Sequence, residues 1–588
     1  MSMLSVTIDG INVEVEAGTR VIDAARQIGV KIPSLCMYPA LDYFPGACRI
    51  CVVEVEGMRG LQASCALPIE RSGMIISTRS RNVIEARRTV LELLISSGVH
   101  ECNTCTRNNN CELQTLAEQY AIRNNPYGNA LVNQREKGAD ESGPSVCRDY
   151  DRCILCGRCV QTCAMVQTVN AIDFADRGYQ AHIAAAGFPK LADSYCINCG
   201  QCIIACPVGA LYEKEDIDPV IEAINDPNKV VVVQTAPATR IALGEELGKP
   251  YGSIVTGQMV AALRRLGFKY VFDTDFSADL TIIEEGHELL HRIQNKGTLP
   301  MMTSCSPGWI RFCETFYPDL LPHISTCKSP QQMMGPLIKT YWAEKMGIDP
   351  AKIVSVSIMP CTAKKYECQR PEMKASGYQD VDYVLTTREL GRMVRMAGID
   401  FGRLADEKYD DPLGESTGAA VIFGATGGVM EAALRTVYEV VVKQDLPKID
   451  FESVRGFKGI KEATVDLAGT PVKVAIAHGM ANARKILDMI RAGECDYTFI
   501  EIMTCPGGCL GGGGQPIPKD ADLDEVKSKR MDAIYRADAG LPIRKSHKNP
   551  SIEKIYQDYL GKPLGERSHH LLHTHYAPRP VVVPNDER

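Results

Sequence analysis

Two runs of cysteines decide how the first part of the chain folds: Cys153-Ile-Leu-Cys156-Gly-Arg-Cys159, closed by Cys163, and Cys196-Ile-Asn-Cys199-Gly-Gln-Cys202, closed by Cys206-Pro207. Each has the spacing C-x2-C-x2-C-x3-C, which is typical of thiolates that hold a pair of [4Fe-4S] clusters. In such pairs the fourth cysteine ligates the other cluster, so Cys206 joins the first three cysteines and Cys163 joins the second three. Structural zinc is the alternative, but it usually takes paired C-x2-C units. The spacing therefore predicts a two-cluster, ferredoxin-type domain that carries electrons.

The composition describes a multidomain globular protein. The chain has 588 residues, of which 45% are hydrophobic and 23% charged, and this length calls for several domains. A net charge of −7 and the lack of a basic cluster with interleaved aromatics argue against nucleic-acid binding. No apolar run reaches 18 residues, so we expect no membrane span. The start lacks a secretory or twin-arginine signal, and 24 cysteines without one indicate metal ligation in a reducing, cytoplasmic and anaerobic setting.

The N-terminal 80 residues predict a β-grasp domain. Residues 5–16 alternate as two strands joined through Asp9-Gly10, and residues 21–28 predict a helix capped by Thr19 and ended by Gly29. Four cysteines follow with a C-x2-C core: Cys36, Cys48, Cys51 and Cys65. This set suits a [2Fe-2S] cluster, although the plant-type spacing is tighter and structural zinc is the alternative.

A histidine lies beside the next three cysteines. The set reads His100-x-Cys102-x2-Cys105-x5-Cys111, in a stretch over 81–121 that is otherwise expected to be helical. An imidazole donates less charge than a thiolate, so a [4Fe-4S] cluster held this way should differ in potential from an all-cysteine cluster. Zinc held by three cysteines and one histidine is the serious rival. Among the cysteines before residue 210, Cys147 alone belongs to none of these sites, and we interpret it as structural.

Beyond residue 229 the pattern becomes α/β, with apolar runs at 230–233, 353–358 and 474–476 that predict parallel strands covered by helices. Three motifs lie in this half: Thr303-Ser-Cys305-Ser-Pro-Gly-Trp309, Met359-Pro-Cys361-Thr-Ala-Lys364-Lys-Tyr-Glu367, and Glu501-Ile-Met503-Thr-Cys505-Pro-Gly-Gly-Cys509-Leu-Gly-Gly-Gly-Gly514. Their cysteines lie beside Pro and Gly, where backbone can approach a bulky inorganic ligand. Buried structural thiols are the alternative, which we prefer for Cys313, Cys327, Cys368 and Cys495.

Together these motifs resemble the signatures TSCCPxW, MPCxxKxxE and ExMxCxxGCxxGG of the [FeFe]-hydrogenases, and the resemblance covers nearly the whole chain. The first 210 residues also resemble the large iron–sulfur subunit of respiratory complex I. The nearest resemblance is to the catalytic subunit of multimeric, NAD(P)-linked and electron-bifurcating hydrogenases.

This resemblance implies an H-cluster, which is a [4Fe-4S] cubane joined to a di-iron unit with CO, cyanide and a bridging dithiolate. It implies that Cys361, Cys505 and Cys509 ligate the cubane, with Cys509 as the bridge to the di-iron unit. Lys364 would bind a cyanide, because a buried ammonium needs an anionic partner. Met359, Met503 and Phe423 would enclose the di-iron unit.

The first motif departs from the family, because Cys305-Ser306 stands where most relatives have two cysteines. Either Cys305 ligates the cubane and Ser306 assists the protons, which is the interpretation we favour, or Cys305 carries the proton and Ser306 or another group completes the cubane. In the family, glutamates that match Glu285 and Glu288 and a serine that matches Ser325 form a proton relay. The two glutamates share a face if their segment is helical; a pair of exposed glutamates is the alternative.

We therefore predict five segments: a β-grasp [2Fe-2S] domain (1–80), a histidine-ligated [4Fe-4S] domain (81–121), a two-cluster ferredoxin domain (140–215), a large α/β H-cluster domain (225–520) and a C-terminal helical segment that resembles a hydrogenase small subunit (521–588). The predicted activity is reversible H2 oxidation and proton reduction, with electrons relayed through one [2Fe-2S] and three accessory [4Fe-4S] clusters. No G-x-G-x-x-G fingerprint opens a helix after a strand, so a flavin and NAD(P) would bind a partner subunit, alongside a small [2Fe-2S] subunit. A single-chain ferredoxin hydrogenase and an H2 sensor with little turnover are the alternatives.

Overall fold

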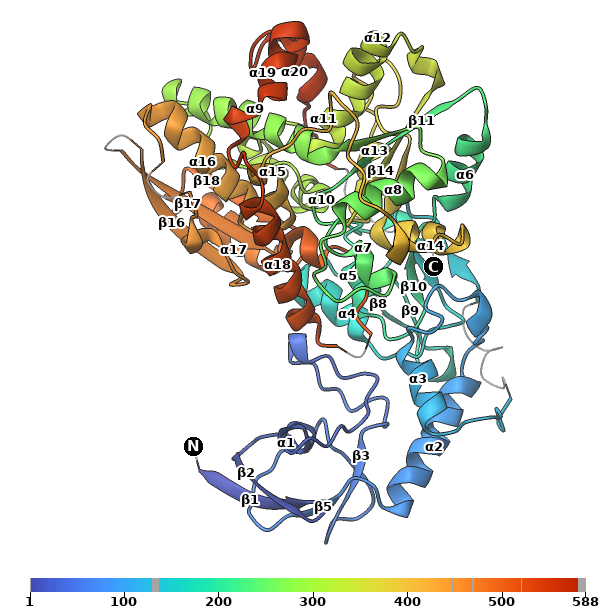
Figure 1. The fold of residues 1–588 in the computed structure, drawn as a ribbon. Coiled ribbons are helices and arrows are strands. Elements are labelled where there is room, and N and C mark those ends of the chain that lie inside the picture. Colours follow the sequence, from blue (N-terminus) through green and yellow to red (C-terminus); the bar gives the residue numbers. More distant parts are fainter. Residues whose placement is uncertain (1, 129–136, 447–448, 468–469, 520, 580–588) are drawn as a thin grey trace. The chain divides into compact units, whose positions relative to one another are not determined.

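The computed structural model describes residues 2–128, 137–446, 449–467, 470–519 and 521–579. The chain forms two compact units, drawn in Figure 1. The first, which we call the cluster unit, comprises Met1–Cys196 and Gln201–Tyr212, and the second, the catalytic unit, comprises Ile197–Gly200 and Glu213–Arg588. None of the helices in the described ranges combines the length and the apolar character that crossing a bilayer requires.

The cluster unit begins with the expected hairpin. Strands β1 (Met3–Ile8) and β2 (Ile11–Glu16) pair antiparallel, with Ile8 opposite Ile11. Asp9 and Gly10 both have positive φ (49° and 87°), which is the two-residue turn that matches the twist of a hairpin. The sheet continues in the order β2-β1-β5-β3-β4, with β3 (Val52–Val55), β4 (Gln62–Ala63) and β5 (Ile75–Ser77).

Helix α1 (Val21–Gln27) buries Val21, Ala24 and Ala25 against this sheet. Arg20 occupies its N-cap and no side chain caps the helix, so the prediction that Thr19 is the cap was wrong. The backbone explains the difference, because the Val21 N–H bonds the Leu67 carbonyl at 3.0 Å and thereby fixes where the helix starts.

The rest of the cluster unit alternates short elements with cysteine loops. Residues 81–121 are not one helix: α2 (Arg81–Ser96) and α3 (Glu112–Gln119) flank the loop with the histidine and cysteines. The ferredoxin segment contains α4 (Arg158–Gln161), α5 (Gln201–Ala205), the hairpin of β8 (Ile172–Ala175) and β9 (His182–Ala185), and the sheet of β6 (Ala139–Asp140), β7 (Val146–Asp149) and β10 (Leu211–Glu213).

The catalytic unit is built on two four-stranded sheets. The first, in the order β12-β11-β14-β15, is all parallel as predicted: β11 (Val230–Thr235), β12 (Tyr270–Asp273), β14 (Ile353–Met359) and β15 (Tyr383–Thr386). The second, in the order β13-β18-β17-β16, is mixed: β13 (Met301–Met302), β18 (Phe499–Met503) and β17 (Thr470–His478) are parallel, whereas β16 (Ile460–Leu467) is antiparallel. The expectation of purely parallel sheets therefore fails at β16, which folds back on β17 as a hairpin.

Helices cover both sheets (Figure 1). The longest is α9 (Thr274–Gln294), most of whose residues are buried. The others are α6 (Ile217–Asn225), α7 (Leu243–Glu246), α8 (Thr256–Leu266), α10 (Pro307–Phe316), α11 (Pro330–Leu337), α12 (Ala343–Met346), α13 (Ala363–Cys368), α14 (Thr387–Met396), α15 (Gly418–Val421), α16 (Gly428–Val442) and α17 (Met480–Ala492).

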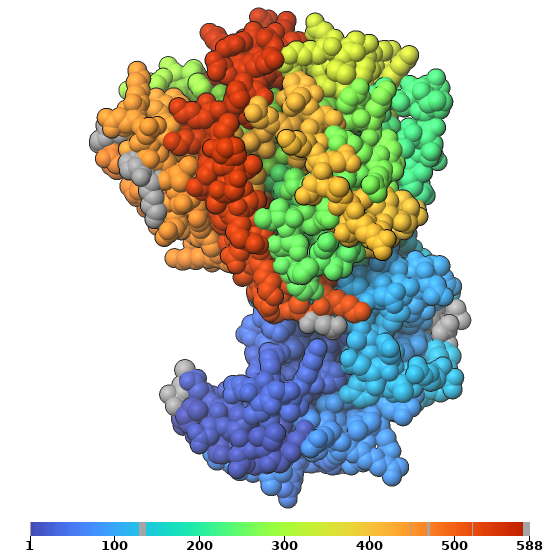
Figure 2. Space-filling model, viewed as in Figure 1, coloured from blue at the N-terminus to red at the C-terminus, as the bar shows by residue number. Residues whose placement is uncertain are grey.

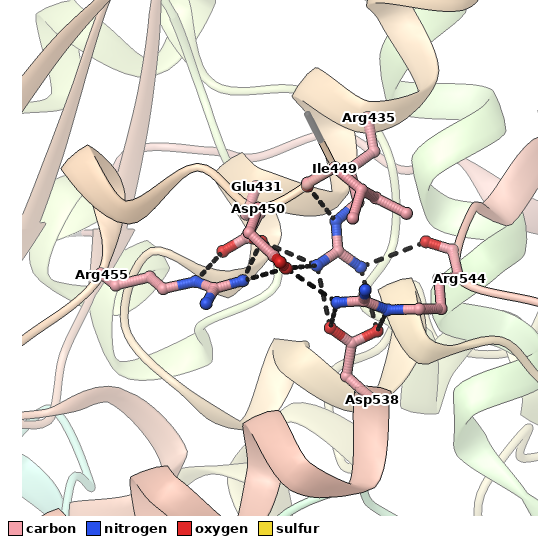
Figure 3. Close-up of polar contacts among 7 residues, drawn as sticks. All are labelled: Glu431, Arg435, Ile449, Asp450, Arg455, Asp538 and Arg544. Carbon is pink, nitrogen blue, oxygen red and sulfur yellow. Dashed lines mark hydrogen bonds and ion pairs between the residues drawn. The ribbon is translucent and has the colours of Figure 1, made fainter. Parts of the chain in front are cut away.

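The described part of the C-terminal segment contains three α-helices: α18 (Leu523–Ala539), α19 (Pro550–Ile555) and α20 (Glu566–Leu572). In Figure 2 this segment (red) runs as a band over the catalytic unit, beside the orange segment. A buried ion network fastens it (Figure 3): Asp538 on α18 pairs with Arg435 on α16 at 2.9 Å and with Arg544 at 2.6 Å. Arg435 also pairs with Glu431 at 2.7 Å. Breaking such a buried network by removing one partner costs about 3–5 kcal/mol, so α18 is firmly attached to α16.

Candidate active site and cluster sites

The four cysteines of the β-grasp domain converge. All four are buried, and Cys36 contacts the thiols of Cys48 and Cys65 while Cys51 contacts Cys65. Hydrogen bonds from the Cys48 thiol, and next from Cys65, lower the pKa of Cys36, so this thiol loses its proton readily. The donor set of four mutually close sulfurs, one readily ionised, fits a small iron–sulfur cluster.

His100 and its three cysteines line one cavity. His100, Cys102, Cys105 and Cys111 share it with Gly209, where a Cβ would come within 2.2 Å of the Cys105 sulfur. His100 bonds the Leu94 backbone, and its Nε2 is buried with no hydrogen-bond partner among the described residues. Burial lowers the pKa of His100, which keeps the imidazole neutral. A neutral, oriented nitrogen beside three sulfurs is what a metal ligand requires, so this set fits a cluster held by one histidine and three cysteines.

The ferredoxin cysteines of the cluster unit have one another as neighbours. Burial chiefly, and after it neighbouring sulfur charges, raise the pKa of several of them. Cys206 neighbours Cys156 and Cys159, and Cys163 neighbours Cys196 and Cys202, as the expected grouping requires. Cys202 also neighbours Cys159, so these contacts do not by themselves separate the two groups. Arg148 donates to the Cys153 sulfur at 3.6 Å, so its positive charge offsets part of the charge of the first group.

The catalytic unit contains one large cavity at the carboxyl ends of its strands. It encloses about 830 Å³ of space not filled by protein atoms, part of it open to solvent. Ten residues that the sequence had singled out line it: Cys199, Cys305, Ser306, Met359, Cys361, Lys364, Phe423, Met503, Cys505 and Cys509. The lining loops follow β11, β13, β14 and β18, so both sheets contribute, as at a crevice beyond strand ends.

Glycines bring backbone close to this cavity. A Cβ on Gly512 would come within 2.2 Å of the Pro360 carbonyl oxygen, and one on Gly508, whose φ is +79°, within 2.7 Å of the Thr426 nitrogen. Only glycine fits these positions. The loops with Cys361 and Cys509 therefore close on one another, and the three thiols of Cys361, Cys505 and Cys509 in one cavity fit the cubane of an H-cluster.

Lys364 has a partner that the sequence had not indicated. Its Nζ donates to Glu367 at 2.7 Å and to the Cys305 carbonyl oxygen at 3.2 Å. The Ser329 hydroxyl also donates to Glu367, at 2.9 Å. The residue was present in the second motif, but only the fold brings its carboxylate to the ammonium. Thr504 and Gln331 also line the cavity and were missed, since neither residue type marks a site.

Cys305 and Ser306 face different neighbours. Burial, and next the charge of Glu285, raise the pKa of the Cys305 thiol, to which Lys364 and Cys509 are further neighbours. Ser306 instead shares a 2.8 Å hydrogen bond with the Thr504 hydroxyl, next to Cys505. Ser306 is the N-cap of α10 but makes no capping bond with its side chain, so the hydroxyl is committed to the cavity.

The carboxylates of α9 form a chain that leads away from Cys305. Glu285 and Glu288 are both buried, and each bonds the Ser325 hydroxyl, which donates to Glu288 at 2.8 Å. Burial, and next the charge of Glu288, raise the pKa of Glu285 to about 8. Glu288 then pairs with Arg292 at 2.6 Å, near the end of α9. Glu285 and Glu288 do share a helix face, but they are not the exposed pair of the alternative interpretation.

Five family profiles match successive parts of the chain. Residues 229–513 match the profile for "Iron only hydrogenase large subunit, C-terminal domain" and 524–579 the one for "Iron hydrogenase small subunit". Residues 1–81, 87–126 and 152–210 match a 2Fe-2S binding domain, an NADH-ubiquinone oxidoreductase-G iron-sulfur binding region and a 4Fe-4S dicluster domain.

Relatives match along nearly the whole chain. The NADP-reducing hydrogenase subunit HndD of Solidesulfovibrio fructosivorans is 51% identical over 98% of this chain and 100% of its own length. Iron hydrogenase 1 of Clostridium pasteurianum is 42% identical over 98% and 100%. A solved [FeFe]-hydrogenase of Chlamydomonas reinhardtii matches 61% of this chain and 98% of its own, with 44% identity and a TM-score of 0.55. The chain is therefore an iron hydrogenase catalytic subunit and belongs to the [FeFe]-hydrogenase large-subunit family.

Proposed function

We propose that the cavity of the catalytic unit is the site of reversible H2 oxidation and proton reduction, within a hetero-oligomer that exchanges electrons with NAD(P). The H-cluster, when bound, supplies the chemistry of making and breaking H2. Cys361, Cys505 and Cys509 would hold it, because these thiols share one cavity, and the resemblance assigns the bridging role to Cys509. Lys364 would donate to a cyanide, and Met359, Met503 and Phe423 would exclude water. The single observation that carries this proposal is the convergence of all three motifs on one cavity.

For the first motif the contacts favour the second interpretation, in which Cys305 carries the proton and Ser306 or another group completes the cubane. Cys305 is the proton-carrying thiol, because the carboxyl of Glu285 is close enough for its charge to act on this thiol. The Ser306 hydroxyl shares a hydrogen bond with the hydroxyl of Thr504, the residue that precedes the cubane ligand Cys505. The protons would then pass from Cys305 to Glu285, through the Ser325 hydroxyl to Glu288, and out at Arg292. Glu285 suits this task, since a carboxyl with a pKa of about 8 both holds and releases a proton near neutral pH.

Electrons would enter the cluster unit at two places. Gly157 follows Cys156, and a Cβ there would lie 2.5 Å from the hydroxyl of Tyr43, whose pKa is raised by burial and next by the charge of Cys36. Gly209, beside the Cys105 sulfur, lies three residues after Cys206. The ligands of the [2Fe-2S] site and those of the histidine-containing site thus each lie near the first group of ferredoxin cysteines. This supports two separate entry points for electrons, which join at the cluster of that group.

In the catalytic unit the loop with Cys199 delivers the electrons. The Thr362 hydroxyl donates to the Asn198 carbonyl at 2.7 Å, so this loop touches the loop of Cys361. Two inlets allow two partners: a flavin- and NAD(P)-binding subunit with a small [2Fe-2S] subunit, and ferredoxin. Such a protein would carry out electron bifurcation. The five segments with the boundaries given above, the three accessory [4Fe-4S] clusters and a cytoplasmic location belong to the same proposal.

The partner proposal is tested by affinity purification of the tagged chain from its native host under anaerobic conditions. We expect a flavoprotein to co-purify and H2-dependent reduction of NAD or NADP to require it. A chain that purifies alone and reduces only ferredoxin would contradict the partner proposal and favour the single-chain hydrogenase. A fully assembled enzyme with almost no turnover would favour the sensor, although the intact series of Glu285, Ser325, Glu288 and Lys364 argues against it.

A further inference from the structure

Three side chains of different ligand types meet beside the carboxylate chain of α9. The Cys327 sulfur lies 3.8 Å from Oε2 of Glu288 and 4.0 Å from Nδ1 of His573, and all three ligand atoms lie within 4.8 Å of one another. All three residues are buried. They come from α9, from the loop before α11 and from the residue that follows α20.

The backbone holds two of these residues in register. The stretch around Cys327 and the stretch around His573 form an antiparallel bridge. Its hydrogen bonds run from the Lys328 nitrogen to the Leu572 oxygen and from the Thr574 nitrogen to the Thr326 oxygen, each at 2.8 Å. The backbones that carry the two ligand atoms are therefore fixed relative to one another.

A buried carboxylate orients the imidazole. Oε2 of Glu284 lies 3.1 Å from Nε2 of His573, and Glu284 is itself held by the Tyr556 hydroxyl and by the Leu564 N–H at 2.9 Å. A carboxylate beside Nε2 favours the tautomer with the hydrogen on Nε2, so Nδ1 accepts a hydrogen bond from the Thr326 hydroxyl at 2.8 Å, with the Cys327 sulfur at 4.0 Å. A metal ion on Nδ1 would displace this hydroxyl. A carboxylate behind a histidine is the usual outer support of a metal-binding imidazole.

We propose that Glu288, Cys327 and His573 form a binding site for Zn²⁺ or a similar divalent cation. Tetrahedral zinc with bonds of about 2.0–2.3 Å places a sulfur about 3.6 Å from a nitrogen or oxygen ligand, so the present 3.8 and 4.0 Å need to shorten by only a few tenths of an ångström. On binding, the Cys327 S–H bond breaks, its proton leaves to solvent and a sulfur–metal bond forms. No electrons are transferred, and water completes the coordination.

The site would act as a brake on proton transfer. A cation on Oε2 of Glu288 takes the oxygen that accepts from Ser325 at 2.8 Å, so the hop between these two residues stops. This consequence rests on the proton route proposed above, whereas the binding itself does not. The C-terminal segment, which supplies His573, thereby gains a role in regulation.

Binding and inhibition are tested separately with Zn²⁺ on the fully iron-loaded, full-length enzyme. Zinc X-ray absorption should show one sulfur at about 2.3 Å and nitrogen or oxygen neighbours at about 2.0 Å. H2 production should fall with the same zinc dependence and recover with a chelator. Cys327→Ser should remove the sulfur signal and weaken binding more than the ~10–100-fold expected for Glu284→Gln, which loses only the outer support.

Cys495→Ser is the matched control, because Cys495 is a half-buried thiol outside every proposed site, and it should change neither readout. Cluster spectra recorded before and after zinc exclude displacement of iron. A sulfur signal that persists in Cys327→Ser would overturn the proposed site. Stoichiometric binding that Cys327→Ser abolishes, without loss of turnover in the wild type, would support the site but overturn the brake and the route through Glu288.

Discussion

Glu285→Gln tests the proton route most sharply, because glutamine has nearly the shape of the neutral acid but carries no exchangeable acidic proton. The structure gives the magnitude. A carboxyl pKa raised from 4.5 to about 8 corresponds to a preference for the neutral form of about 5 kcal/mol. Removing the acid should also lower H2 turnover by ~10²–10⁴-fold, the usual contribution of a positioned proton-transfer group.

The sign of the stability effect follows from the direction of the shift. The unfolded chain releases this proton near pH 4.5, whereas the folded chain keeps it up to about pH 8. The wild type therefore loses stability as the pH rises between these values, and the loss is complete above the folded pKa. Glutamine has no such loss, so the stability advantage of Glu285→Gln should widen by about 2 kcal/mol between pH 6 and pH 8.

The assay combines H2 production at matched iron content with thermal unfolding at both pH values. Glu284→Gln is the control, because Glu284 is the preceding buried glutamate on α9 but bonds Tyr556 and His573 rather than Ser325. It should retain most of the turnover. A Glu285→Gln enzyme with full cofactor content and near-normal turnover, or one whose stability advantage does not change with pH, would refute the assignment of Glu285.

Three further substitutions test other parts of the site. Cys305→Ala should keep the iron content and lower turnover at least ~100-fold; loss of cubane iron instead would show that Cys305 is the ligand. Cys509→Ala should abolish turnover and the infrared bands of the di-iron unit while leaving the spectra of the N-terminal clusters intact, and retained turnover would contradict the bridge. His100→Cys should shift the reduction potential of one accessory cluster, because a thiolate donates more charge than an imidazole; an unchanged redox titration would favour zinc or a histidine that is not a ligand.

Much of the fold could be predicted because local patterns agree with the tertiary structure. Asp9-Gly10 favours a two-residue hairpin turn whatever the flanking strands are, and the observed pairing of Ile8 with Ile11 is the register that such a turn gives. The valine run at 230–233 favours a strand buried on both faces, because valine is β-branched and the run is short, and it forms β11. Cysteine spacing likewise encodes cluster ligands, because three thiolates within seven residues can wrap one corner of a cubane without help from the rest of the chain.

What the sequence could not show depends on residues brought together from distant positions. Thr19 has the right residue type for a helix cap, but a backbone bond between Val21 and Leu67 moved the helix start. The neighbours of Cys305 and Ser306 lie on α9 and after β18, so an alignment of the first motif alone could not assign their roles. Cys327 and His573 are 246 residues apart and meet only through the C-terminal strand pairing.

The central claim is that three motif loops and one cavity hold an H-cluster in this chain. Infrared spectroscopy of the anaerobically purified, fully matured protein tests it most directly, together with metal analysis. We expect CO and cyanide bands and about twenty irons per chain, the sum over the proposed clusters. A protein without these bands, and with zinc in place of much of that iron, would contradict it.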